Sequence, residues 1–131
     1  MESYEKDKQA FTISGRIRSM RHACRGLLIF IKNEHNAWLH IVALIAVVML
    51  GMYFSISSIE WLFIILAVGI VFVAEAFNTA LEIDMNLTSP EFNPKARDTK
   101  DIAAGAVLIT SLAALLIGLI IFIPKILWCF K

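Results

Sequence analysis

The chain has 131 residues, of which 59% are hydrophobic and 18% are charged, and its formal net charge at pH 7 is +1. A soluble domain of this length is usually less apolar, so the composition predicts a membrane protein built as one domain, residues 1–131. The nearly balanced charge gives no support for nucleic acid as a partner.

An amphipathic helix is predicted over about residues 8–33. Apolar side chains recur there at helical spacing, on the side opposite Arg18, Arg21 and Arg25. A basic helix with one apolar face is typical of a membrane surface. We therefore expect this helix to lie on the membrane rather than to cross it.

Three apolar segments follow, and each is predicted to be a transmembrane helix. They cover residues 37–54, 59–80 and 102–123. A helix needs roughly 20 mostly apolar residues to cross the hydrocarbon core of a bilayer. The last segment contains no charged residue and meets this requirement best. The predicted fold class is an all-α membrane protein with one surface helix and three spans.

The polar segment of residues 84–101 separates the second and third spans and is predicted to be a loop. Two prolines interrupt it, and it carries Lys95, Arg97 and Lys100. Because basic residues favour the cytoplasmic side of a membrane, this loop and the arginine-rich surface helix are both expected in the cytoplasm. The N-terminus would then be cytoplasmic.

A polar stripe runs along the end of the second span. At about 100° per residue, Glu75, Asn78, Glu82 and Asn86 project within roughly 60° of one another. For Asn78 and Thr79 taken alone, hydrogen bonding that packs one helix against another and a functional role are both open. Two carboxylates two turns apart are different, because each needs a cation, a proton or a metal inside a membrane. The stripe therefore predicts a functional site at the cytoplasmic end of this span.

Three further polar residues are expected at the same membrane surface as Glu82. Glu34 precedes the first span, and Lys100 and Asp101 precede the third. Taken singly, they are typical of a solvated interfacial charge and of a charge pair at a helix start. Together with Glu82 they indicate a magnesium site with polyphosphate oxygens, because Mg²⁺ prefers one or two carboxylates combined with waters and phosphates.

The sequence contains none of several motifs that are typical of other catalytic or metal sites. There is no Walker-type glycine-rich loop, no zinc-ligand spacing and no serine nucleophile motif. We interpret His22, His35 and His40 as interfacial polar residues rather than metal ligands.

The motif EAFNTALE, residues 75–82, followed by KDIAAGAVL, residues 100–108, resembles the small prokaryotic diacylglycerol kinases and the closely related undecaprenol kinases. Residues 22–40, HACRGLLIFIKNEHNAWLH, are similar to the segment before that family's first span. The resemblance covers nearly the whole chain. It implies a homotrimer in the bacterial cytoplasmic (inner) membrane, with active sites at the cytoplasmic surface between neighbouring subunits.

The resemblance also implies roles for individual residues. Glu75 would be the catalytic base, supported by Asn78, while Glu34 and Glu82 would bind a Mg²⁺ ion that bridges the phosphates of ATP. The lipid alcohol would enter from the bilayer, with its hydroxyl beside Glu75 and a contact from Trp38. The remaining contacts to ATP would come from Glu91, Phe92, Asn93, Lys100 and Asp101.

Three positions depart from the family's pattern. Asn86 stands where the family usually has an aspartate, so an oxygen acceptor is kept and a charge is lost. His22 and Asn93 stand where enterobacterial members carry a tyrosine and a histidine in their nucleotide contacts. The preference among nucleotides is therefore open.

The predicted function is that of an ATP-dependent lipid kinase, which transfers the γ-phosphate to diacylglycerol and produces phosphatidic acid. Undecaprenol, giving undecaprenyl phosphate, is the alternative acceptor, and the residues do not decide between the two. A non-enzymatic channel or assembly subunit, with the carboxylate stripe in a pore or a partner contact, is the alternative of another class.

Overall fold

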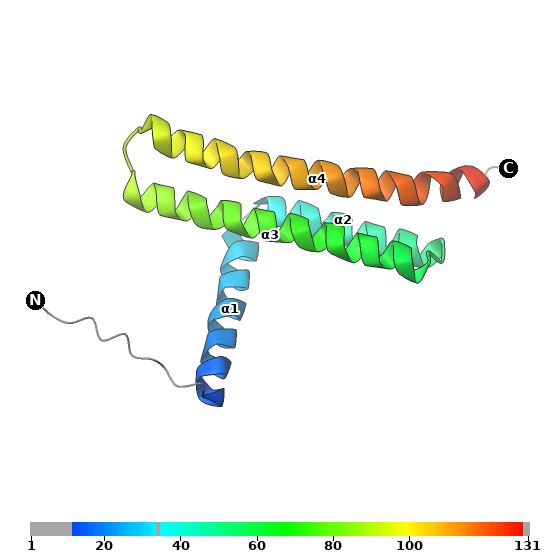
Figure 1. Ribbon diagram of the computed structural model, residues 1–131, viewed down its shortest axis with the longest axis horizontal. Coiled ribbons are helices and arrows are strands. Elements are labelled where there is room, and N and C mark those ends of the chain that lie inside the picture. Colours follow the sequence, from blue (N-terminus) through cyan, green and yellow to red (C-terminus); the bar gives the residue numbers. More distant parts are fainter. Residues whose placement is uncertain (1–11, 34, 130–131) are drawn as a thin grey trace, which may run out of the picture.

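The computed structural model describes residues 12–33 and 35–129, without the side chains of residues 33–37. This part of the chain folds into four α-helices and contains no strand (Figure 1). The helices are α1 (Ile13–Asn33), α2 (His35–Tyr53), α3 (Ser58–Thr88) and α4 (Pro94–Cys129). The predicted all-α fold class is confirmed.

The helices have the apolar surface of a membrane protein. Both α3 and α4 are long and apolar enough to cross a bilayer, and α2 contributes a shorter apolar stretch, Trp38–Tyr53. Most of the large apolar side chains on these three helices are exposed in the single chain. Exposed apolar surface of this extent has to be covered by lipid or by neighbouring subunits.

Figure 1 shows α3 and α4 running antiparallel and side by side, with α2 along another side of α3 and α1 pointing away from these three helices. The predicted amphipathic helix is thus present from Ile13 onward, and residues 8–11 lie outside the described part. Its Phe30 is buried near the end of α1, where the ring packs edge-on against Phe72 of α3 at a centroid distance of 6.4 Å. This contact joins the outlying helix to the bundle.

The prediction of a loop over residues 84–101 is wrong, because only residues 89–93 are non-helical. Polar residues can continue a helix beyond the apolar layer, since water satisfies their side chains there. Pro94 takes the first helical position of α4, where its missing N–H group costs nothing. The Asn93 side chain accepts a hydrogen bond from the backbone N–H of Lys95 at 3.0 Å, which caps the new helix.

At the end of the bundle away from the 89–93 connection, a short turn joins α2 to α3 and side chains pack closely between the helices. The α2–α3 turn passes through Ser55, whose φ of 49° lies in the left-handed region. A Cβ atom on Gly51 would come within 2.7 Å of the Trp61 ring, so glycine is what allows this indole to pack against α2. A buried cluster of Ile56, Ile64, Ile121 and Phe122 fills the space between the helices here.

Candidate active site

The buried Glu75 side chain of α3 meets a histidine of α2. Glu75 lies on α3 and is only 2% exposed. His40 on α2 places its Nε2 atom 2.9 Å from Oε1 of Glu75. The His40 ring packs against Phe72, which in turn contacts Phe30 of α1. The carboxylate is therefore buried and contacts His40 of α2, whose ring is linked through Phe72 to Phe30 of α1.

The next turn of α3 carries two buried polar residues with different hydrogen-bonding states. Thr79 donates its hydroxyl hydrogen to the backbone oxygen of Glu75 at 3.0 Å, so the helix itself satisfies it. Asn78 donates to Glu82 at 3.4 Å, but its Oδ1 atom is buried and has no hydrogen-bond partner within the described residues. An unsatisfied buried acceptor costs about 1–3 kcal/mol. Asn78 therefore has an oxygen suited to a ligand.

A lysine stands at the loop-side end of the stripe. Lys100 on α4 donates from Nζ to Oδ1 of Asn86 on α3 at 2.7 Å. Asn86 is exposed, and Lys100 is half-buried. Because an amide is neutral, this contact orients the lysine without cancelling its positive charge. The structure thus brings Lys100 to the same helix face that carries Glu75, Asn78 and Glu82.

The other residues expected from the sequence are not gathered at this stripe. Asp101 is exposed and forms an ion pair with Arg97 at 3.6 Å, while Asn93 caps α4. Trp38 is 60% exposed on α2. Glu91 and Phe92 are exposed in the 89–93 connection, and Glu34 lies outside the described residues.

The oxygen atoms near Glu75 suit a metal ion that is bound mainly by the phosphates of a substrate. Within residues 12–33 and 35–129, no three acidic, histidine or cysteine side chains cluster closely enough to bind a metal by themselves. The Glu82 carboxylate and the unpartnered Asn78 oxygen are hard oxygen donors. Since Mg²⁺ commonly uses one or two protein oxygens together with phosphates and waters, these residues fit a magnesium–phosphate complex.

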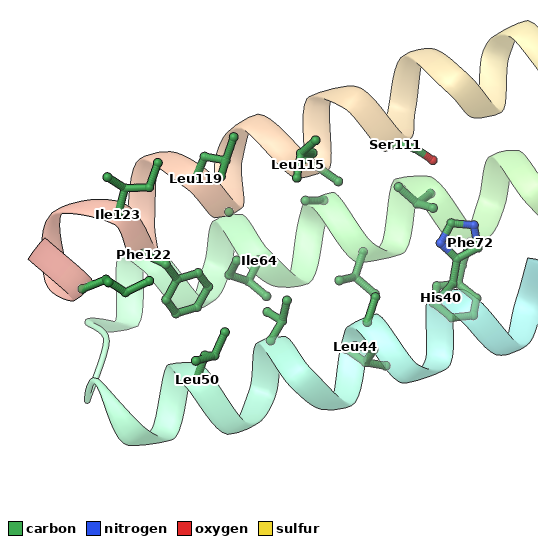
Figure 2. A pocket seen from close by; sticks show the side chains of 18 residues that line it. His40, Leu44, Leu50, Ile64, Phe72, Ser111, Leu115, Leu119, Phe122 and Ile123 are labelled. Atoms are coloured by element: carbon green, nitrogen blue, oxygen red, sulfur yellow. The ribbon is translucent and has the colours of Figure 1, made fainter.

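An apolar groove leads away from Glu75. It lies between α2, α3 and α4, has a volume of about 410 Å³ and extends from His40 to Ile126 (Figure 2). His40 and Ser111 are the polar residues in its lining, and the remainder are apolar or glycine. Figure 2 shows His40 and Phe72 at one end of the groove and Phe122 and Ile123 toward the other. The end of the groove that is lined by His40 therefore lies next to Glu75.

The sequence interpretation missed the contact between His40 and Glu75. It treated His40 as an interfacial polar residue rather than as a metal ligand. An available signal was that an ionisable side chain inside an apolar segment needs a partner. Sequence spacing does not show which residue of α3 lies opposite His40, since the relative positions of two helices depend on tertiary packing.

Comparison with known proteins identifies a family and several relatives of similar sequence. A family model described as prokaryotic diacylglycerol kinase matches residues 21–122. The chain is 38% identical over 109 residues to an undecaprenol kinase of Bacillus subtilis, covering 83% of this chain and 89% of that relative. It is 30% identical over 110 residues to a diacylglycerol kinase of Synechocystis sp., covering 83% of this chain and 63% of that relative.

The helical membrane fold and these matches define an integral membrane lipid kinase, a phosphotransferase with an alcohol group as acceptor. The chain belongs to the prokaryotic diacylglycerol kinase family. Membership in a kinase family supports the enzymatic interpretation over the channel or assembly subunit.

Proposed function

We propose that this protein transfers the γ-phosphate of magnesium-bound ATP to the hydroxyl of undecaprenol at the cytoplasmic surface of a bacterial membrane. The observation that carries the proposal is the position of Glu75. Its buried carboxylate lies where a polar stripe meets the end of an apolar groove that is lined by His40. A water-soluble phosphate donor and a membrane-bound alcohol can meet at such a point.

Undecaprenol is favoured as the acceptor by the extent of the match to the Bacillus subtilis relative, which is aligned over 89% of its length at 38% identity. Diacylglycerol is the second candidate. It is favoured by the Synechocystis relative, a diacylglycerol kinase that is aligned over 63% of its length. Both acceptors present a hydroxyl group at the polar end of a long hydrocarbon.

Glu75 acts as the general base in the proposed reaction. His40 holds Oε1, so Oε2 can accept the proton of the lipid hydroxyl. The hydroxyl oxygen then forms a bond to the γ-phosphorus, while the bond from that phosphorus to the oxygen bridging to the β-phosphate breaks. ADP leaves, and the proton remains on Glu75. Burial of the carboxylate keeps water from competing for this position.

The phosphate donor is held along the next turns of α3. Glu82 and Asn78 would hold the magnesium ion, together with Glu34, and Lys100 would contact the phosphates; the open Asn78 oxygen and the position of Lys100 on this helix face support these roles. Magnesium supplies charge neutralisation on the transferring phosphoryl group. Phosphoryl transfer depends mostly on positioning and charge neutralisation, so one base, one metal and one lysine suffice. The proposal also assigns ATP contacts to Glu91, Phe92, Asn93 and Asp101.

The lipid acceptor occupies the apolar groove in this proposal. The hydrocarbon lies between α2, α3 and α4, and the hydroxyl ends beside Glu75. Trp38, exposed on α2 near its start, contacts the lipid from the membrane side. Hydrocarbon in this groove is shielded from water without any polar partner, which suits a lining made mostly of apolar side chains.

We further propose a homotrimer in the cytoplasmic (inner) membrane with the site on the cytoplasmic side. The orientation is supported by the basic residues of α1 and of the first turns of α4. The exposed apolar faces of α2 to α4 provide surface for subunit contacts as well as for lipid. The mass of the purified protein in detergent tests the trimer.

The acceptor is tested by phosphate transfer from γ-labelled ATP with Mg²⁺, in mixed micelles that contain either undecaprenol or diacylglycerol. We expect a higher kcat/KM with undecaprenol and no product from Glu75→Gln. A clear preference for diacylglycerol would overturn the acceptor assignment. Absence of transfer to both lipids by a stable wild-type oligomer would overturn the lipid kinase assignment.

A further inference from the structure

We propose that His40 is the positioning residue of the catalytic base, and this inference rests on the proposed role of Glu75. The two side chains come from different helices and meet at 2.9 Å between Nε2 and Oε1. The side chain of His40 is 24% exposed, and that of Glu75 is 3% exposed. The contact is therefore a largely buried hydrogen bond between α2 and α3.

The direction of this hydrogen bond follows from the chemistry of the base. An ionised carboxylate can only accept hydrogen bonds, so Nε2 of His40 carries the hydrogen and donates it to Oε1. One carboxylate oxygen is then engaged, and the other is left for the lipid hydroxyl. A carboxylate held at one oxygen cannot rotate freely, which fixes the direction from which the hydroxyl must approach.

The imidazole is itself held in place by aromatic packing. Its ring centroid lies 6.1 Å from that of Phe72, with the two planes inclined at 58°. Phe72 packs edge-on against Phe30, which is 5% exposed and belongs to α1. The surface helix α1 thus supports the base through two aromatic rings and His40. A side chain restrained in this way holds its hydrogen-bond donor in one position.

His40 is the side-chain partner of Glu75 across the α2–α3 contact. Among the basic side chains, Arg97 pairs with Asp101, Lys125 pairs with Glu60, and Lys100 is bonded to the neutral Asn86. The carboxylate of Glu75 is almost fully buried, so losing its donor leaves a buried acceptor that water cannot readily satisfy. The side chain of His40 is therefore the group on which the orientation of this base depends.

Three substitutions of His40 separate positioning from packing. His40→Gln retains a donor nitrogen the same number of bonds from the backbone as Nε2, whereas His40→Asn places its donor one bond closer to the backbone and out of reach. His40→Leu removes the donor. We expect kcat of the Leu and Asn variants to fall on the order of 10- to 100-fold, with the KM for ATP unchanged. His40→Gln should recover kcat to within a few-fold of wild type.

Glu75→Gln is measured in parallel, so that the two proposals can fail separately. Wild-type turnover in His40→Leu, or equal loss in His40→Gln and His40→Leu, would overturn the positioning role while an inactive Glu75→Gln still supports the base. An active Glu75→Gln would overturn the proposed function itself.

A spectroscopic measurement keeps the inference testable if a His40 variant does not assemble. In the wild-type protein labelled with ¹⁵N-histidine, we expect Nε2 of His40 to carry the hydrogen. The resonance of the proton on Nε2 of His40 should move upfield in the Glu75→Gln variant, because an amide oxygen is a weaker hydrogen-bond acceptor than a carboxylate. An unprotonated Nε2 atom, or a resonance that does not respond to this substitution, would overturn the inference.

Discussion

Glu60 and Glu75 both lie on α3, and their surroundings differ. Near the α2–α3 turn, Glu60 accepts a hydrogen bond from the backbone N–H of Ser57 at 2.7 Å and forms an ion pair with Lys125 at 2.9 Å. The Ser57 side chain accepts in return from the backbone N–H of Glu60, which completes a capping box. Among the described residues at this end, Glu60 and Lys125 therefore neutralise each other.

The loop-side end has incomplete pairing. The buried oxygen of Asn78 has no partner within the described residues, and the bond from Asn78 to Glu82 is 3.4 Å long. Lys100 is held by a neutral amide rather than by a carboxylate. Glu75 itself lies 2.9 Å from Nε2 of His40, so the open groups in this region are the Asn78 oxygen and the Lys100 charge. We interpret the pairing around Glu60 as structural, and the proposed phosphoryl transfer uses the open groups near Glu75.

The largest expected effect distinguishes the two glutamates directly. Glu75→Gln removes the general base, and we expect turnover to fall by about 10²- to 10⁴-fold while the oligomer remains intact. Glu60→Gln is the matched control on the same helix. It should keep wild-type turnover and lower the melting temperature, because it weakens the Lys125 ion pair. Equal losses of turnover in both variants would contradict a catalytic role for Glu75 that Glu60 does not share.

Asn78→Leu should separate stability from activity. The substitution removes a buried oxygen that has no partner, so we expect the melting temperature to stay constant or rise. Turnover should fall by about 10- to 100-fold, because an oxygen donor for the metal is lost. Thermal unfolding and a magnesium titration of activity provide the two readouts. A lower melting temperature with normal activity would instead show that Asn78 serves packing.

Lys100→Ala tests the phosphate contact, with Lys125→Ala as the control at the other end of α4. Loss of a charged donor to a phosphate should raise the KM for ATP by about 10- to 100-fold. Lys125→Ala should leave this constant unchanged, since its partner is Glu60. Steady-state kinetics with ATP as the varied substrate measures both, and an unchanged KM in Lys100→Ala would contradict the assignment.

Asn86→Asp should have the smallest effect. A carboxylate at this exposed position would form an ion pair with Lys100 and compete with phosphate for its charge. Because exposed ion pairs contribute about 0–1 kcal/mol, we expect the KM for ATP to rise no more than about fivefold. A large gain in activity would instead show that asparagine at this position is a handicap.

The sequence predicted the fold and the polar stripe because both depend on local periodicity. Three apolar segments and one amphipathic segment were enough to anticipate the four helices. The stripe from Glu75 to Asn86 follows from helix geometry alone. The ends of α3 and α4 were placed wrongly because a polar composition was taken for a loop, although water allows polar helices to continue. The pairing of His40 with Glu75 depends on how α2 lies against α3, which no single segment encodes.

Paramagnetic broadening by Mn²⁺ bound to a non-hydrolysable ATP analogue tests the comparison most directly. The account predicts strong broadening of the side-chain amide signals of Asn78 and little effect on the indole of Trp61, which packs near the α2–α3 turn. Broadening of Trp61 with Asn78 unaffected would contradict the assignment of nucleotide binding to the loop-side end of α3.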